Sequence, residues 1–305
     1  MRVLVIGQSG QIARVLSVLG RKSDHQIATK GRADCDLMQT ANIPKCLLMP
    51  NGEKPEVIVN AAAYTAVDNA ECDGQTAYIL NRDACQALAL ACKDSEIPLV
   101  HISTDYVYKS DGSAALLETN PTGPINVYGH SKLAGEFEIT KEHDQHIILR
   151  TAWVFSSTGN NFVKTVLRLA ADHDELQIVA DQIGNPTAAN DLGAAIITII
   201  DRLSRKEKDD DFFGVYNFAG RGDISWANFA RTIFSISKQN GGPSCDVRDI
   251  LTDEFPSRAS RQLNSRLDTT KFETVFGPIP SWEGQLQEVV KELVSTGGSL
   301  LSKPE

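Results

Sequence analysis

The chain begins with a short apolar run that leads directly into a glycine turn. Residues 3–6, Val-Leu-Val-Ile, are typical of a buried strand, and Gly7 and Gly10 follow at once. From Ile12 onward, apolar residues recur at helical spacing. A strand, a glycine turn and a helix N-terminus in this order expose backbone N–H groups and the positive end of a helix dipole, which attract a pyrophosphate. The segment therefore predicts a dinucleotide site; the alternative is a purely structural turn.

The alternation of strands and helices continues along the first half of the chain. Apolar runs typical of strands buried on both faces recur at residues 57–59, 99–102 and 147–149. Segments with helical spacing lie between them, at 77–91 and 132–141. Such alternation predicts an α/β fold with a doubly wound parallel sheet of the Rossmann type.

The second half of the chain has a looser rhythm and predicts a smaller lobe. Residues 192–203 still read as a helix and residues 214–218 as a strand, and we expect both to return to the sheet. We therefore expect a dinucleotide-binding domain over residues 1–155, to which residues 188–220 return. An irregular, interleaved substrate-binding lobe should occupy residues 156–305.

Composition argues against several classes of protein. The 305 residues carry 30 Lys and Arg against 39 Asp and Glu, and a formal charge of −9 lacks the basic surface that nucleic-acid binding needs. No apolar run approaches the roughly 18–20 residues that span a bilayer, and the first run is too short for a secretory signal. We expect a cytoplasmic protein without a nucleic-acid or membrane partner. The charged run at 206–211 reads as a solvated loop. The six cysteines form no C-x-x-C pair, and Cys85 and Cys92, seven residues apart in an apolar helical pattern, read as small buried hydrophobic residues.

The second expected strand, at residues 26–28, is followed by two cations and no carboxylate. At this position an Asp or Glu binds the ribose hydroxyls of NAD, whereas a cation accommodates the 2′-phosphate of NADP. Lys30 and Arg32 therefore predict a preference for NADPH, with use of NADH left open. The alternative is that both cations are ordinary exposed residues.

A tyrosine, a lysine and a threonine suggest the chemistry. Tyr128 and Lys132 stand four residues apart, so a helix places them on one face, about one turn apart. Thr104 follows the strand at 99–102, at the sheet edge where doubly wound folds bind ligands. A phenol beside a cation can protonate the alkoxide that hydride transfer to a carbonyl creates, and a neighbouring hydroxyl can hold the reacting oxygen. The three residues predict carbonyl reduction; the alternative is a half-buried tyrosine beside a lysine with a packed stem.

These residues fall within motifs that resemble the extended short-chain dehydrogenases/reductases and, within that superfamily, the family of dTDP-4-dehydrorhamnose reductases. The resemblance runs over nearly the whole chain. Its most specific motifs are VNAAAYTAVD at 59–68, STDYVY at 103–108, NVYG at 126–129, SKLAGE at 131–136, RTAWV at 150–154, and Asp181-Gln182 with Gly184 and Pro186-Thr187.

The resemblance implies an activity and a set of contacts. It implies NADPH-dependent reduction of the C4 keto group of dTDP-4-dehydro-L-rhamnose to dTDP-L-rhamnose by a homodimer, with Thr104, Tyr128 and Lys132 as catalytic residues. The expected cofactor contacts are Gly7, Gly10, Gln11, Ile12, Lys30, Arg32, Asp36, Leu37, Ala61, Ala62, Ala63, Tyr128 and Lys132. The expected substrate contacts are Thr65, Val67, Asp105, Tyr106, Trp153, Arg261 and Asn264. In the motif that contains Arg261 and Asn264, Gln262 stands where the family has a proline.

The same resemblance raises the question of a metal ion. Some members of the family bind Mg²⁺ between subunits through acidic side chains. Here Val15 and Asn190 occupy positions where those members carry acids, and Glu292 alone supplies too few oxygens for Mg²⁺. We therefore expect no structural metal ion.

Four other functions share parts of this pattern. A reductase of another NDP-4-keto sugar would use the same residues. A dehydratase would need an acid and a base after the threonine, but Asp105 is followed by Tyr106. An epimerase would need further groups that move protons, and His130 lies on a different helical face from Tyr128 and Lys132. A non-catalytic nucleotide-binding subunit, similar to the regulatory subunit of methionine adenosyltransferase, would keep the fold and act through a partner protein.

Overall fold

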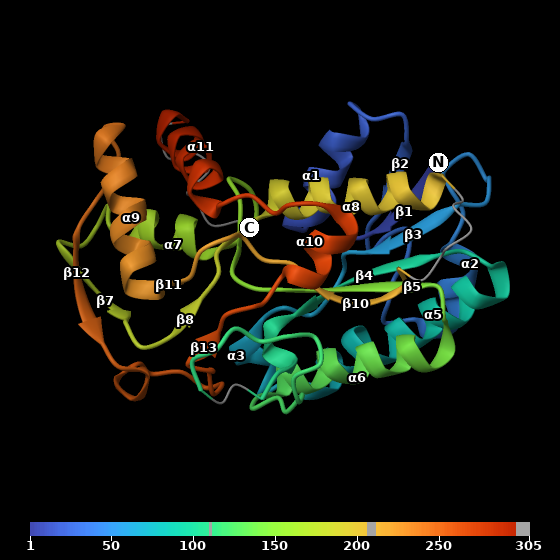
Figure 1. Ribbon diagram of the computed structural model, residues 1–305, viewed down its shortest axis with the longest axis horizontal. Helices are drawn as coiled ribbons and strands as arrows, with labels where there is room; N and C mark the ends of the chain where they lie inside the picture. The colour runs from blue at the N-terminus through green and yellow to red at the C-terminus, as the bar shows by residue number, and fades with distance from the viewer. Residues whose placement is uncertain (110–111, 206–211, 297–305) are drawn as a thin grey trace.

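A parallel sheet forms the larger of two lobes (Figure 1). The structure, a computed structural model, describes residues 1–109, 112–205 and 212–296. Within these residues the sheet has six strands in the order β10-β5-β4-β3-β1-β2, all parallel. They are β1 (Arg2–Ile6), β2 (Gln26–Lys30), β3 (Val57–Asn60), β4 (Leu99–Thr104), β5 (His146–Thr151) and β10 (Gly214–Asn217). The doubly wound parallel sheet expected from the sequence is confirmed.

Helices cover both faces of the sheet. Along β1, Val3 and Val5 are buried on one face, and Leu4 and Ile6 on the other. The first face packs against α1 (Gln11–Gly20), α8 (Ala189–Ser204) and α10 (Thr270–Phe276), and the second against α2 (Ile43–Cys46), α5 (Ala84–Ser95) and α6 (Val127–Glu142). Burial on both faces explains why the strands read as continuous apolar runs.

The strand order changes direction at β1. The chain passes from β1 to β2 on one side, and then returns to form β3 on the other side of β1. In doubly wound sheets, ligands bind beyond the carboxyl ends of the strands at such a switch point. The expected site residues Gly7, Ala61 and Asp105 each come directly after a strand that ends at this edge.

The helix expected at residues 77–91 contains an irregular turn. The helix α4 (Gly74–Tyr78) continues through a π-helical turn (Ile79–Asp83) into α5. This turn brings the carbonyl group of Asn81 against Gly135 of α6, where a Cβ would overlap the oxygen. The other short helices of this lobe are η1 (Thr40–Asn42), α3 (Val67–Ala70) and η3 (Asp105–Val107).

The smaller lobe is more regular than expected, because its three longer described helices each carry an apolar face. The helices α7 (Phe162–Leu169), α9 (Trp226–Gln239) and α11 (Trp282–Ser295) enclose a core that includes Phe155, Phe229 and Trp282. Its other elements are β6 (Val154–Phe155), β7 (Glu175–Val179), β8 (Ile183–Gly184), β9 (Thr187–Ala188), β11 (Ile224–Ser225), β12 (Asp246–Ile250), η4 (Thr252–Glu254) and β13 (Asn264–Ser265). The strand β10 pairs with β5 and α8 packs on the same sheet, and the division of the chain into two domains stays a prediction.

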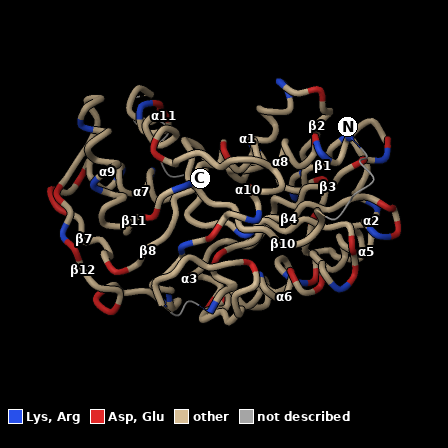
Figure 2. The backbone as a smooth tube through the Cα atoms, viewed as in Figure 1, with Lys and Arg blue, Asp and Glu red and all other residues tan. Residues whose placement is uncertain are grey.

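The surface carries basic and acidic residues interspersed over the outer helices and loops (Figure 2). The charge run at 206–211 lies outside the described residues. Within the described part of the chain, none of the helices is long and apolar enough to cross a membrane. Cys85 and Cys92 are buried, as expected, and Cys72 lies exposed in a turn after α3.

Candidate functional site

The glycine turn after β1 forms a cradle that side chains would fill. Gly7 has a φ of 122°, and a Cβ there would lie 3.3 Å from the carbonyl of Ala61. Gly10 is the N-cap of α1 and offers no side chain to its free N–H groups. The first turn, Gln-Ile-Ala, has no charge of its own, so these N–H groups are available to an anion.

Two neighbours hold this turn in place. Ile12 is buried under the sheet, and Gln11 reaches across to the other lobe. The Oε1 of Gln11 accepts hydrogen bonds from Ser156 Oγ (2.7 Å) and Asn161 Nδ2 (3.1 Å). Residues 61–63 follow β3 beside the glycines and are half-buried. The turn is therefore fixed by both lobes before any ligand binds.

The two cations predicted to select the cofactor lie at the end of β2. The backbone N–H of Gly7 donates to the Lys30 carbonyl (2.8 Å), which places Lys30 beside the glycine turn. The Lys30 Nζ donates to the Cys46 carbonyl (2.7 Å), whereas the Arg32 side chain is 82% exposed and lies 3.6 Å from Asp36. Leu37 is buried in the core, so only its backbone could contact a ligand. Arg32 is thus the more available positive charge.

Capping interactions at the start of α6 position the tyrosine. The Oδ1 of Asn126 accepts a hydrogen bond from the Gly129 N–H (2.8 Å), and its Nδ2 donates to the Ser260 carbonyl (2.8 Å). Glu71 accepts a hydrogen bond from the Val127 N–H (2.8 Å). These bonds satisfy the free N–H groups of the first turn. They connect Tyr128, which lies in that turn, to the C-terminal end of α3 and to the C-terminal segment.

Thr104, Asp105 and Gln262 form a buried chain beside Tyr128. The Thr104 hydroxyl donates to Asp105 Oδ1 (3.0 Å), and Gln262 Nε2 donates to Asp105 Oδ2 (2.8 Å) and Ser265 Oγ (2.9 Å). All four side chains are buried. A hydroxyl that gives its proton to a carboxylate has only lone pairs left for other partners. Thr104 therefore faces the phenol of Tyr128, with which it is in hydrogen-bond contact, as an acceptor.

Burial sets the protonation of the acids around this chain. Burial raises the pKa of Asp105 to about 6, against hydrogen bonds that lower it. Burial also raises the pKa of Tyr128, a shift increased by Asp105 and Tyr106, so the phenol keeps its proton at neutral pH. The ring of Tyr106 packs edge-on at 5.6 Å, and burial raises its pKa to about 12.

Lys132 lies one turn beyond Tyr128 and is 1% exposed. Its Nζ donates to the Ile102 carbonyl (2.7 Å) and lies 3.1 Å from His101 Nε2. Burial lowers the pKa of Lys132. From the sequence we expect Lys132 to act on the phenol, whereas in the structure its amine is turned toward β4.

Hydrophobic and charged residues surround the phenol on the substrate side. Val67 and Tyr106 pack against Tyr128, and Thr65 is exposed in the loop before them. Arg261 Nη2 binds Asp68 Oδ2 (2.6 Å), an interaction that holds the pKa of Asp68 well below its usual range. This pair joins α3 to the C-terminal segment.

Trp153 has a strained backbone next to the same site. Its φ is 49°, in the left-handed region that is costly for a bulky residue. The indole stacks on Trp226 with ring centroids 3.5 Å apart, and a Cβ at Gly184 would lie 2.8 Å from it. The stack and the small neighbour hold Trp153 in this unusual conformation.

The structure brings five of the predicted residues together. Thr104, Asp105, Tyr106, Tyr128 and Val67 form one cluster. In contrast, Asn264 is 1% exposed and its Nδ2 donates to the Ala114 carbonyl (2.7 Å), so its role as a substrate contact stays a prediction.

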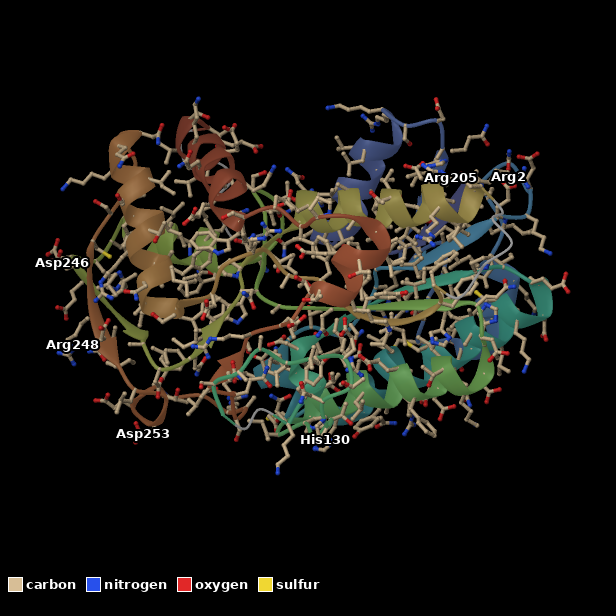
Figure 3. The ribbon with its side chains drawn as sticks, viewed as in Figure 1. Arg2, His130, Arg205, Asp246, Arg248 and Asp253 are labelled. Carbon is tan, nitrogen blue, oxygen red and sulfur yellow. The ribbon has the colours of Figure 1, made fainter. Side chains whose placement is uncertain are left out.

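Sequence reasoning assigned no role to four residues that the structure places at the site. His101 and Asn60 lie behind Lys132, Asn81 binds Ser131 and the backbone of Tyr64, and Trp226 stacks on Trp153. Asn60 ends a buried strand, and this position in the sequence could have indicated that it lies near the site. His130, the residue considered for epimerisation, is exposed and projects outward from α6 (Figure 3).

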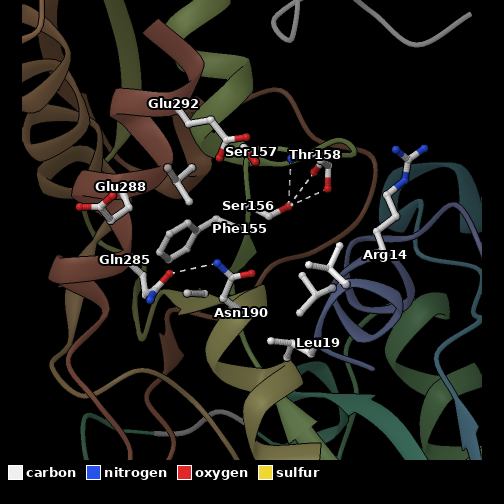
Figure 4. Close-up of a pocket in the computed structure, with 14 residues that line it drawn as sticks. Arg14, Leu19, Phe155, Ser156, Ser157, Thr158, Asn190, Gln285, Glu288 and Glu292 are labelled. Carbon is white, nitrogen blue, oxygen red and sulfur yellow. Dashed lines mark hydrogen bonds between the residues drawn. The ribbon is translucent and has the colours of Figure 1, made fainter. Parts of the chain in front are cut away.

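The three positions examined for Mg²⁺ line one cavity of about 260 Å³ (Figure 4). It lies between α1, α8, α11 and the loop after β6. Val15 contributes an apolar wall, and the Asn190 amide donates to Gln285 (3.2 Å). Glu288 and Glu292 of α11 lie on the opposite side. Magnesium prefers a near-octahedral set of oxygens, which this combination of residues does not offer.

Removal of divalent cations should therefore leave the protein unchanged. We expect dialysis against EDTA to change neither kcat nor the melting temperature, because Val15 and Asn190 offer no carboxylate to a metal ion. Elemental analysis measures the metal content of the purified protein, with EDTA-treated protein as the control. Stoichiometric Mg²⁺ whose removal lowers the melting temperature would contradict this prediction.

Comparisons with known proteins give one consistent result. Residues 1–295 match the family model described as RmlD substrate binding domain. The chain is 42% identical over 298 residues to a dTDP-4-dehydrorhamnose reductase of Sinorhizobium fredii, covering 97% of this chain and 99% of that protein. The crystal structure of a dTDP-4-dehydrorhamnose reductase from Clostridium acetobutylicum has a TM-score of 0.87 and 31% identity, covering 96% and 99%. The structure of dTDP-4-dehydrorhamnose reductase from Bacillus anthracis in complex with NADP has a TM-score of 0.86 and 32% identity, covering 95% and 99%.

Proposed function

The chain belongs to the RmlD substrate binding domain family, and from this premise we propose that it is a reductase of nucleotide-linked keto sugars. The reaction is the NADPH-dependent reduction of the C4 keto group of dTDP-4-dehydro-L-rhamnose, which gives dTDP-L-rhamnose. The observation that carries the proposal is the contact of Thr104 with Tyr128, one helical turn from the buried Lys132, beside a glycine cradle that fits a pyrophosphate.

The residues present fit a bound dinucleotide. Gly7 leaves the space that a Cβ would fill, and the free N–H groups of α1 lie behind it. Residues 61–63 line the adjacent strand end, and Lys30, Arg32, Asp36 and the backbone of Leu37 would border the adenosine end. When bound, the nicotinamide supplies the hydride for C4. Tyr128 and Lys132 would border the nicotinamide half.

The chain itself supplies the proton and the geometry. Tyr128 is kept protonated by burial, so it can donate a proton to the oxygen on C4 as negative charge develops there. Thr104 gives its own proton to Asp105 and accepts at its lone pairs, which holds the phenol in one orientation. Thr65, Val67, Tyr106, Trp153 and Arg261 would surround the sugar nucleotide and exclude water.

Three other functions fit these residues less well. A dehydratase would need a carboxylate base beside Asp105, and the pKa of about 12 at Tyr106 keeps that phenol neutral. An epimerase would need further proton-transfer groups, and His130 faces solvent. A non-catalytic subunit would not need the buried chain from Tyr128 to Gln262, whose polar groups are costly to bury without a use.

The direct test is turnover of the proposed substrate. NADPH oxidation should be followed by absorbance, with dTDP-4-dehydro-L-rhamnose generated in situ by an upstream dehydratase and epimerase. Turnover with this substrate and none with the corresponding UDP-linked keto sugars would support the proposal. NADPH binding without turnover of any keto-sugar nucleotide would overturn it in favour of a binding subunit.

Cofactor choice should depend on Arg32. In Arg32→Ala we expect the KM for NADPH to rise about tenfold and the KM for NADH to stay unchanged, because a charge-assisted hydrogen bond to the 2′-phosphate is lost. Arg21→Ala, an exposed arginine at the end of α1, serves as the matched control. Equal changes for both cofactors would show that Arg32 does not read the 2′-phosphate.

Gln262 should control the pH dependence through Asp105. Its amide donates to the carboxylate and so favours the ionised form; without it the pKa of Asp105 rises above about 6. In Gln262→Leu we expect the acidic limb of kcat/KM, where activity is lost on protonation of Asp105, to move up by about one pH unit. Gln86→Leu removes an amide donor from Glu138, away from the site, and should leave the profile in place. An unmoved limb in Gln262→Leu would contradict the assignment.

The proposed oligomeric state and cellular location also rest on membership of this family. We propose a cytoplasmic homodimer whose ligands are NADPH and a dTDP-sugar, without nucleic-acid or membrane partners. Light scattering after size exclusion would test the dimer, with a monomer at micromolar concentration as the contradicting result.

A further inference from the structure

A chain of buried polar groups runs behind the catalytic residues. The backbone N–H of Ala62 donates to Asn60 Oδ1 (3.2 Å), and Asn60 Nδ2 lies 3.1 Å from His101 Nδ1. On the other side of the ring, His101 Nε2 lies 3.1 Å from Lys132 Nζ. Asn60, His101 and Lys132 are each at most 1% exposed. Each contact therefore needs one donor and one acceptor, because bulk water cannot satisfy a mismatch.

The backbone end of the chain determines the direction of every bond. The N–H of Ala62 can only donate, so Asn60 presents its oxygen to Ala62 and its NH₂ group to His101. The NH₂ group also only donates, so His101 Nδ1 accepts and carries no hydrogen. Burial lowers the pKa of His101 well below its usual value, so the ring is neutral. Its one hydrogen is therefore on Nε2.

The hydrogen on Nε2 points to the lysine amine. An ammonium group has three N–H donors and no lone pair, so a charged Lys132 would face Nε2–H donor against donor at 3.1 Å. A neutral amine has a lone pair that accepts this bond, and one of its own N–H groups donates to the Ile102 carbonyl. A charged Lys132 would require the Asn60 amide to turn over, which would set its NH₂ group against the N–H of Ala62.

We propose that Asn60 and His101 hold Lys132 as a neutral amine in the cofactor-free protein, and that Lys132 takes up a proton from solvent when the dinucleotide binds. The lone pair of Nζ forms the new N–H bond, and Nζ must then release the Nε2–H of His101, since an ammonium cannot accept. His101 is thus a positioning residue that acts through Lys132. The nature of the ligand rests on the proposed function; the tautomer of His101 does not.

The surrounding charges are consistent with this uptake. Besides His101, the titratable groups that act on Lys132 are Cys85 of α5 and Glu136 of α6. Burial raises the pKa of Cys85 to about 11, so its thiol is neutral, and the charge of Glu136 is paired with Arg150 of β5. The negative charge of a dinucleotide favours the ammonium form. Lys132 would then place a positive charge near Tyr128 only in the loaded enzyme.

The tautomer of His101 is the first test and needs no activity. Nitrogen NMR of the cofactor-free protein labelled with ¹⁵N-histidine should show His101 neutral with its hydrogen on Nε2, the signal being assigned by its loss in His101→Gln. A hydrogen on Nδ1, or a protonated ring at neutral pH, would overturn the proposal. Because this result precedes any turnover, it separates failure of the inference from failure of the proposed function.

Proton uptake on binding is the second test. NADPH is titrated calorimetrically at about pH 8 in buffers of different ionisation enthalpy, since its 2′-phosphate is already dianionic there. We expect the wild type to take up about one proton more per NADPH bound than Lys132→Met does. In His101→Gln, the amide oxygen can accept from an ammonium, so Lys132 is already charged and the uptake should be lost as well. The same uptake in all three proteins would overturn the proposal.

Discussion

Replacing Tyr128 with Phe should lower kcat for the keto sugar by roughly 10²–10⁴-fold, the usual contribution of a positioned proton donor. The phenol is the group that burial keeps protonated beside Thr104, and the pKa of its neighbour Tyr106 lies at about 12 in an edge-on ring. Removal of the hydroxyl leaves the alkoxide on C4 without its proton donor. The ring itself remains, so the packing of Val67 and Tyr106 around it is preserved.

The measurement is steady-state kinetics together with the Kd for NADPH. We expect the Kd to stay within about twofold, because the glycine cradle and the adenosine end are unchanged. Tyr78→Phe is the matched control: it removes a phenolic oxygen in α4 and keeps the ring on which Arg82 stacks. A kcat for Tyr128→Phe within tenfold of the wild type would show that another group donates the proton.

The parts of the site that sequence could predict are those attached to strand ends. Gly7, Ala61 and Thr104 each lie at or directly after the end of a buried apolar run, and parallel strands bring their carboxyl ends to one edge. The i, i+4 spacing likewise places Tyr128 and Lys132 together on α6. These predictions need only local periodicity and the rule for parallel sheets.

The parts that sequence could not predict depend on contacts between distant segments. Gln262 reaches Asp105 across 157 residues, and a change from the family's proline gave no indication of that hydrogen bond. The π-helical turn between α4 and α5 brings Asn81 against Gly135 of α6, a contact that no helical period encodes. The orientation of the Lys132 amine toward His101 likewise follows from burial between α6 and β4.

A buried ion pair holds the strand on which Thr104 stands. Arg150 of β5 binds Glu136 of α6 through Nε (3.1 Å) and Nη2 (2.6 Å), and the two side chains are 6% and 4% exposed. Ser103 Oγ donates to Glu136 Oε1 (2.5 Å), one residue before Thr104. Arg150 also lies 4.7 Å from the ring centroid of Tyr108. Burial alone would lower the pKa of Arg150, but Glu136 outweighs it and raises the pKa, so both charges persist.

Arg150→Met should therefore lower the free energy of unfolding by about 3–5 kcal/mol, because it leaves the carboxylate of Glu136 buried without its partner. Arg221→Ala breaks the ion pair with Glu273, in which Arg221 is 63% exposed, and should cost at most about 1 kcal/mol. Urea unfolding followed by circular dichroism measures both. The double variant Arg150→Met/Glu136→Leu removes both charges and should recover much of the loss, since no uncompensated charge remains. If Arg150→Met were no more destabilising than Arg221→Ala, the pair would not be what fixes β4 against α6, and the orientation of Thr104 would have to come from Asp105 and Gln262 alone.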